Sequence, residues 1–255
     1  MKLKDSLKIF KKKWYVLVPI EIIFWVLILL ALFVSAGRIN MAMSQMDALA
    51  PELNHLQNTL TQDSDLSILD PLLNQLNNIL NQVYLTLIIT ILFIFLLFVI
   101  MQSFQFNYSY KAKSYFNYLK KFLIIALMLF LLFIPILYYL YKNLLTLLLT
   151  DSGSYLLFFS AVFLYLILYL ANLLFILSLK YNFRNSFSQL RERIFNWKYF
   201  VGYVIFTVAI ILIFVLDKLI TYTYPIKYLV IFDFLILMAV IVIFRIVFIK
   251  LIISE

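Results

Sequence analysis

Six long apolar stretches constrain this chain more than any other feature of its sequence. Each is close to the roughly 20 apolar residues that a helix needs to cross the hydrocarbon core of a membrane, and they occupy residues 14–36, 83–101, 122–141, 155–179, 199–219 and 228–253. Charged residues make up only 13% of the chain, against about a quarter in a soluble domain. None of the stretches alternates between apolar and polar residues, as the strands of a membrane barrel do. We therefore predict an all-α integral membrane protein with six transmembrane helices.

Lys and Arg residues near the ends of these stretches predict the orientation of the chain. Sixteen of them lie in the N-terminal segment 1–13, in the connections 102–121 and 180–198 and near the C-terminus, whereas four lie in the opposite connections. Because Lys and Arg are enriched in cytoplasmic loops, we expect a multi-pass protein of the cell (cytoplasmic) membrane with both termini in the cytoplasm. Residues 34–36 have the form of a signal-peptide cleavage site, but five more spans follow, so we expect an uncleaved first span.

The segment 37–82 is the longest polar part of the chain and carries a heptad pattern. Apolar residues recur at alternating spacings of three and four in two runs, 39–60 and 69–83. Asp70 followed by a proline is typical of the start of a helix. We therefore predict an extracytoplasmic helical hairpin that continues the first two spans outward. Pro51 should kink or restart its first arm.

The apolar seams of this predicted hairpin have two possible roles. They either bury against each other, or part of the first seam docks a membrane or extracytoplasmic protein partner. The residues that would form this docking seam are Leu49, Leu53, Leu56 and Leu60.

A short basic amphipathic stretch precedes each odd-numbered span. Apolar and aromatic residues at spacings of three and four alternate there with Lys and Arg, a pattern typical of a helix that lies in the membrane interface. Anionic lipid headgroups attract such residues by roughly 1 kcal/mol per cation. We expect contacts with anionic headgroups from Lys11, Lys12, Lys13, Lys120, Lys121, Arg184, Arg191 and Arg193.

The three basic stretches share one motif, in which a serine is followed by two apolar positions and then by a basic–apolar pair. It reads Ser6-Leu7-x-x-Phe10-x-x-Lys13-Trp14, then Ser114-Tyr115-x-x-Tyr118-x-x-Lys121-Phe122, then Ser186-Phe187-x-x-Leu190-x-x-Arg193-Ile194. Two spans follow each copy, which predicts three repeats of an interfacial helix plus a hairpin of spans. The alternative is a chance match, because the composition is strongly biased.

Ionisable residues inside a span are functional candidates, because a charge in lipid is costly. Glu21 and Arg245 lie at matching depths, roughly 8–13 Å below the cytoplasmic boundary by helix rise, and we predict an ion pair between them. The alternative is that each reaches the headgroups or water separately. Near the outer surface we predict a charge cluster made of Asp217, Lys218, Lys227 and Asp233.

Composition excludes several kinds of chemistry. The chain has no cysteine, one histidine (His55) and three isolated glycines, which leaves nothing for thiolate metal sites, histidine-rich metal sites or phosphate-binding glycine loops. We find no nucleophile paired with a base and expect neither a cofactor nor a metal. We therefore expect no enzymatic activity and no nucleic-acid partner.

Two function classes remain. The favoured one is a structural, accessory, or partner- or lipid-binding membrane component. The alternative is a transporter or channel for small solutes or ions that uses Glu21, Asp233 and Arg245, although the predicted spans have few midplane polar residues and few helix breakers.

Overall fold

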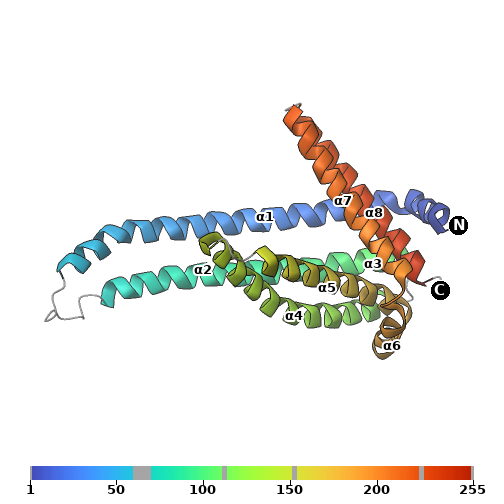
Figure 1. Cartoon of the computed structure of the whole chain (residues 1–255), viewed down its shortest axis with the longest axis horizontal. Helices are drawn as coiled ribbons and strands as arrows, with labels where there is room; N and C mark the ends of the chain where they lie inside the picture. Colours follow the sequence, from blue (N-terminus) through green and yellow to red (C-terminus); the bar gives the residue numbers. More distant parts are fainter. Residues whose placement is uncertain (1, 60–69, 111–113, 151–153, 224–226, 254–255) are drawn as a thin grey trace. The chain divides into compact units, whose positions relative to one another are not determined.

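The computed structural model describes residues 2–59, 70–110, 114–150, 154–223 and 227–253, and every element within these ranges is a helix (Figure 1). In chain order they are α1 (Lys2–Thr59), α2 (Asp70–Leu97), a π-helical turn η2 (Phe98–Gln102), α3 (Ser103–Tyr110), α4 (Tyr115–Thr150), α5 (Ser154–Lys180), α6 (Phe183–Arg193), α7 (Trp197–Thr223) and α8 (Lys227–Ile253). The prediction of an all-helical chain is confirmed.

Length and hydropathy show that the chain is a multi-pass membrane protein. Among the described residues, five helical stretches are long and apolar enough to cross a membrane: Ser6–Pro51, Asp70–Tyr110, Tyr115–Leu132, Val162–Lys180 and Phe234–Ile253. A sixth is present if α6 and the first part of α7, which meet at 89°, are counted as one broken span. Within the described residues, five or six helical stretches could therefore cross a membrane, and six were predicted.

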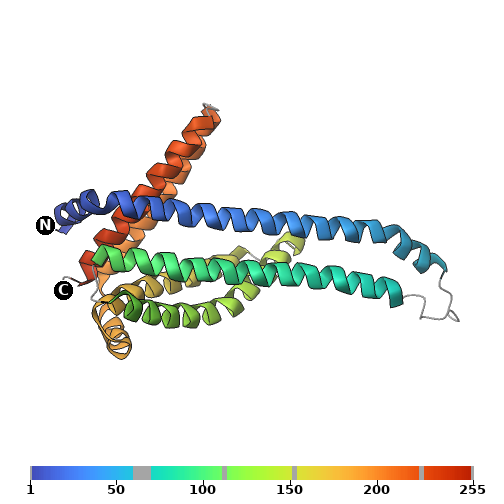
Figure 2. The ribbon, with the colours of Figure 1, turned by 180° about the vertical axis from the view of Figure 1, so that it is seen from behind.

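The chain divides into two compact units. The first comprises Met1–Ile22 together with Val99–Glu255, and the second comprises Ile23–Phe98. Within the second unit, α1 and α2 run alongside each other in opposite directions (Figures 1 and 2). The turn that would join them lies outside the described residues.

The first unit has an apolar core with a strong aromatic component. The rings of Phe122 in α4 and Phe175 in α5 stack with their centroids 4.0 Å apart, and Phe106 of α3 packs against both. The rings of Phe206 in α7 and Phe244 in α8 stack at 3.9 Å. Because a chain with three glycines has few small residues for close helix approach, large side chains fill the space between its helices.

Helix boundaries differ from the predicted ones in the first part of the chain. The first span, the basic segment before it and the predicted outer arm form one helix, α1, which passes through Pro51 without a break. The ribbon only curves near this end (Figure 1). The connection 102–121 also differs from a simple loop, because α3 continues the helix to Tyr110 and α4 begins at Tyr115.

Only the third basic stretch forms a helix of its own. Asn196 ends the turn after α6, and its Oδ1 accepts a hydrogen bond from the Lys198 backbone N–H at 3.1 Å, so it caps the start of α7. The corresponding positions after Lys13 and Lys121 hold aromatic and aliphatic residues with no capping group. The first two stretches therefore run directly into α1 and α4 as continuous helix.

The contact between α7 and α8 gives a first testable prediction. A Cβ added at Gly202 would meet Leu251 Cδ2 at 3.6 Å and Phe248 Cε2 at 3.7 Å, which are ordinary van der Waals distances. Glycine inside a helix is about 0.5–1 kcal/mol less favourable than alanine. We expect Gly202→Ala to raise the free energy of unfolding in mixed micelles by up to about 1 kcal/mol. A loss of stability would show that the two helices approach more closely than described.

Candidate functional site

The structure brings Glu21 and Arg245 together inside the first unit. Arg245 Nη1 donates a hydrogen bond to Glu21 Oε2 at 3.0 Å, although the residues are 224 positions apart. The Glu21 side chain is 2% exposed and that of Arg245 is 11% exposed. Next to this pair, Leu17 of α1 packs with Val242 and Ile246 of α8 in a buried apolar cluster. The pair therefore joins α1 to α8 in an environment with little water, where an unpaired charge is costly.

Arg245 also lines a small cavity of the first unit. The guanidinium lies 5.2 Å from the ring centroid of Phe106, close enough for a cation–π interaction. The cavity measures about 110 Å³, and its lining includes Tyr203 and Asn172. Asn172 Nδ2 donates to the Leu168 carbonyl at 2.9 Å and lies 3.5 Å from the Tyr203 hydroxyl. This gives a mainly aromatic cavity with one cation and two neutral polar groups.

Helix α3 carries a buried polar face. Gln105 and Ser109 are four positions apart, hence on one face, and both are buried, as is Gln102 in η2. Neither the Nε2 nor the Oε1 atom of Gln105 has a hydrogen-bond partner. Burying such groups without partners costs free energy. The polar residues directly after the second apolar stretch, Gln102, Ser103 and Gln105, predict interhelical or interfacial hydrogen bonds, and the Gln105 amide makes none.

Three of the basic residues predicted to contact lipid bind carbonyl groups at the ends of helices. Lys13 Nζ donates to the carbonyls of Tyr108 and Ser109 in the last turn of α3, the latter at 3.2 Å. Lys121 Nζ donates at 2.9 Å to the Tyr181 carbonyl, just past the end of α5. Arg193 Nη1 donates to the Ile252 carbonyl in the last turn of α8.

These contacts satisfy a physical need at each helix end. The last carbonyls of a helix have no partner within the helix, and they form the negative end of its dipole. A cation placed there supplies both a donor and a favourable charge. We call these three residues the capping cations: Lys13, Lys121 and Arg193. They occupy the same place in the three copies of the motif, and each caps the helix that ends the following pair of apolar stretches.

The motif serines are less uniform than the capping cations. Ser6 and Ser186 are buried, and the Ser186 hydroxyl donates to the Asn182 carbonyl at 3.0 Å. Ser114 is exposed and precedes α4, where its carbonyl accepts from the Tyr118 backbone N–H at 3.2 Å. The basic position is thus the one whose contact recurs in all three copies.

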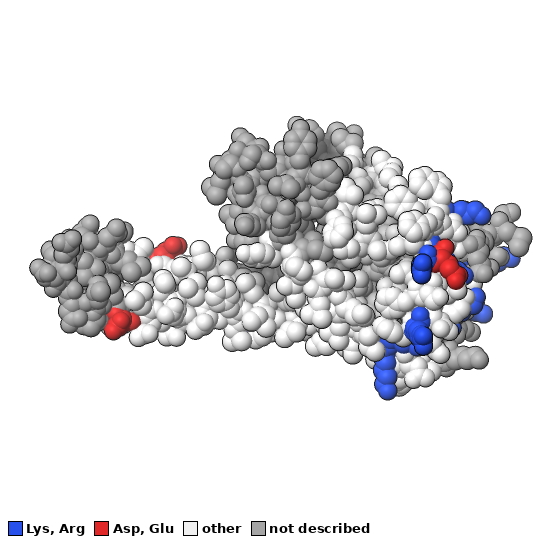
Figure 3. Space-filling model, turned by 60° about the horizontal axis from the view of Figure 1, so that its bottom comes forward, with Lys and Arg blue, Asp and Glu red and all other residues white. Residues whose placement is uncertain are grey.

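The remaining predicted lipid contacts are exposed. They come from α1, α4 and α6 and comprise Lys11, Lys12, Lys120, Arg184 and Arg191. Among the described side chains, every Lys and Arg except Arg38 belongs to the first unit. Figure 3 shows the blue side chains gathered in one region of the surface. We call the five exposed residues, with the helix ends that carry them, the basic end.

Two predicted sites fall mostly outside the described side chains. The outer cluster lies on the last part of α7 and the first part of α8, at Asp217, Lys218, Lys227 and Asp233, whose side chains are not described. In the docking seam, Leu49 is half-buried, the side chains of Leu53 and Leu56 are not described, and Leu60 lies outside the described residues. Both sites stay predictions.

The chain was compared with protein-family models, curated proteins and solved structures. No protein-family model, no curated protein and no solved structure matches the chain. Within the described residues, no three His, Cys, Asp or Glu side chains gather as a metal site requires.

Proposed function

We propose that this chain is a non-enzymatic structural or accessory component of a cell membrane, held against anionic lipid headgroups by its basic end. One observation carries the proposal. Five exposed cations from three helices belong to the first unit, and the visible Lys and Arg side chains gather in one region of the surface (Figure 3). This end would lie on the cytoplasmic side, where anionic lipids and Lys- and Arg-rich segments meet.

The sharp bend before α7 supports the same proposal. Since α6 meets α7 at 89°, α6 would lie along the membrane surface if α7 crosses it. Arg184 and Arg191 are exposed on this helix, whereas Ser186 is fully buried. A helix with a buried side and a basic exposed side fits an interfacial position.

Lipid retention tests the proposal. The five residues of the basic end would be replaced by glutamine, and the purified protein would be exposed to equal amounts of phosphatidylglycerol and phosphatidylcholine before native mass spectrometry. With roughly 1 kcal/mol per cation near an anionic surface, we expect retained phosphatidylglycerol to fall at least tenfold. Arg184→Lys with Arg191→Lys is the matched control, which keeps the charge and should retain lipid. Equal retention by wild type and the five-fold variant would refute the proposal.

A separate experiment tests whether the protein has a stable protein partner. Gentle release of the protein from its own membrane, followed by native mass spectrometry, should show a second protein at fixed stoichiometry. Making the docking seam polar, for example by Leu49→Gln with Leu53→Gln, should then reduce its recovery. A bare monomer in both cases would count against an accessory role.

A transporter or channel is the second candidate, and the interior of the first unit favours it. The Glu21–Arg245 pair lies beside a cavity, and the Gln105 amide is buried without a partner, as in a polar path that takes up water or ions. Proteoliposomes that contain a pH-sensitive or potassium-sensitive dye would detect flux. Under this candidate, Glu21→Gln abolishes the flux, whereas the structural proposal predicts no protein-dependent flux at all.

A further inference from the structure

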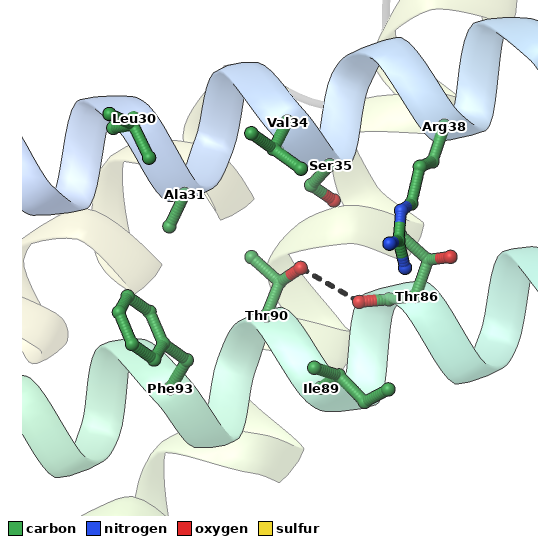
Figure 4. Close-up of a pocket in the computed structure, with 9 residues that line it drawn as sticks. All are labelled: Leu30, Ala31, Val34, Ser35, Arg38, Thr86, Ile89, Thr90 and Phe93. Carbon is green, nitrogen blue, oxygen red and sulfur yellow. Dashed lines mark hydrogen bonds between the residues drawn. The ribbon is translucent and has the colours of Figure 1, made fainter.

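A cavity between α1 and α2 in the second unit has the features of a lipid site. It measures about 230 Å³, far more than the roughly 10–15 Å³ that one water needs. Leu30, Ala31, Val34, Ser35 and Arg38 line it from α1, and Thr86, Ile89, Thr90 and Phe93 line it from α2 (Figure 4).

The two ends of this cavity differ in polarity. Arg38 and Thr86 lie at one end, and Leu30 and Phe93 lie at the other (Figure 4). Since Leu30 and Arg38 are eight residues apart on one helix, the cavity extends about 12 Å along α1. Arg38 comes just after the first predicted span and Thr86 just after the start of the second. The polar end is therefore at the expected membrane boundary and the apolar end within the hydrocarbon region.

Charge identifies the kind of molecule that fits. Arg38 is the only Lys or Arg in residues 23–98, and Figure 4 shows its side chain reaching from α1 toward Thr86 on the facing helix. No Asp or Glu occurs within seven positions of Arg38 or of Thr86, so these two stretches of helix offer it no carboxylate. A guanidinium binds a phosphate through two parallel hydrogen bonds.

Most of the other polar side chains in the cavity are not available to donate hydrogen bonds to a phosphate. The hydroxyls of Thr86 and Thr90 donate to carbonyls of their own helix, those of Gln82 and Thr86, at 2.8 and 2.7 Å. Their protons are therefore engaged within α2. Ser35, which is buried and faces the same cavity, is the other side chain there that carries a hydroxyl donor.

We propose that this cavity binds one anionic phospholipid, with its phosphate on Arg38 and the upper part of one acyl chain between Ala31, Ile89 and Phe93. The positive charge of Arg38 favours the phosphate, and the apolar lining favours the acyl chain. The site belongs to the second unit and to the opposite predicted membrane face from the basic end. It is therefore independent of the proposed function.

Native mass spectrometry of the full chain with equal amounts of phosphatidylglycerol and phosphatidylcholine tests the site. We expect one phosphatidylglycerol that survives when the basic end is neutralised but falls at least tenfold in occupancy with Arg38→Gln. Arg38→Lys should restore part of it, and Ala31→Phe, which fills the cavity, should abolish it without touching the charge. Lys8→Gln, an exposed position outside the basic end, is the control with equal loss of charge and should keep this lipid.

Cross-linking with a phosphatidylglycerol that carries a photoreactive group on its acyl chain shows where the lipid binds. Cross-links should appear in the peptides that contain residues 30–38 and 86–93, and the far-UV circular dichroism of each variant should stay helical. The proposal is overturned if the lipid persists in both Arg38→Gln and Ala31→Phe, or if phosphatidylcholine is retained equally. It is also overturned if Ala31→Phe instead dissociates a dimer, because a second copy would then fill the cavity.

Discussion

Glu21→Leu is expected to lower the free energy of unfolding by about 3–5 kcal/mol, because it leaves the Arg245 guanidinium buried without its carboxylate. The guanidinium cannot escape by losing a proton. The ring face of Phe106, 5.2 Å from the guanidinium, offers only a weaker cation–π interaction in place of the carboxylate. Neutral hydrogen bonds between membrane helices are worth roughly 0.6 kcal/mol on average, so a loss of several kcal/mol would identify a charge effect. Unfolding in mixed micelles, followed by far-UV circular dichroism, gives the measurement.

The reciprocal change, Arg245→Met, should also lower the free energy of unfolding, because it leaves the buried Glu21 carboxylate without its guanidinium partner. The double variant Glu21→Leu with Arg245→Met removes both charges and should lie close to wild type, since a buried ion pair and an apolar pair of similar size are often equivalent.

Exchange of the two charges, Glu21→Arg with Arg245→Glu, is the most direct check on the pair. It should restore part of the stability that either single change removes. If the exchange restores nothing and the double variant costs the sum of the two single changes, the residues do not act as a pair.

The capping cations should give the second large effect. Lys13→Met, Lys121→Met and Arg193→Met each remove a charged donor from helix-end carbonyls, and each should cost about 1–2 kcal/mol. Because the three contacts lie on different pairs of elements, their effects should add to about 3–6 kcal/mol in the triple variant. The same unfolding measurement detects this loss of stability. High salt should change the loss little, because charges that are partly buried are weakly screened.

The chain offers a close control for each of these changes. Lys12, Lys120 and Arg191 lie one or two positions from the capping cations and are exposed. Replacing these three by methionine removes the same charge but no carbonyl contact, so stability should stay within about 0.5 kcal/mol per change. The capping role is wrong if the two triple variants lose equal stability.

The stability losses of the three capping-cation variants also test whether the threefold repeat is real or a chance match. Lys180 of α5 donates to the Ile253 carbonyl at 3.2 Å, so helix ends also receive cations from outside the motif. If the three motif positions are equivalent, the three single losses should be similar. A loss confined to one position would favour chance similarity.

Much of the fold was predictable from local sequence, because spans are selected by hydropathy alone. Runs of about 20 apolar residues must become helices in lipid, where every backbone group needs a partner within the segment. The stretches 155–179 and 228–253 match α5 and α8 within two residues at each end. Matching depth also suggested Glu21 and Arg245 as partners, since opposite charges in lipid rarely stay apart.

The roles of the cations could not be decided in the same way. Lys12 and Lys13 are neighbours with the same charge in one run of lysines, yet one is exposed and the other reaches the end of α3. That difference depends on which helix end lies beside α1, which is a property of the packing and not of the local pattern. The same holds for Gln105, which becomes buried only because α4, α5 and α8 surround α3.

The sequence by itself determined that this chain is helical and multi-pass, because the free energy of placing an apolar helix in lipid depends on that helix alone. Its charge pattern also supplied the candidate ion pair and the candidate basic surface. The tertiary structure decided which charges stay exposed, which ones cap helices and where a cavity remains between α1 and α2. These outcomes depend on contacts between segments up to 224 positions apart, which no local pattern encodes.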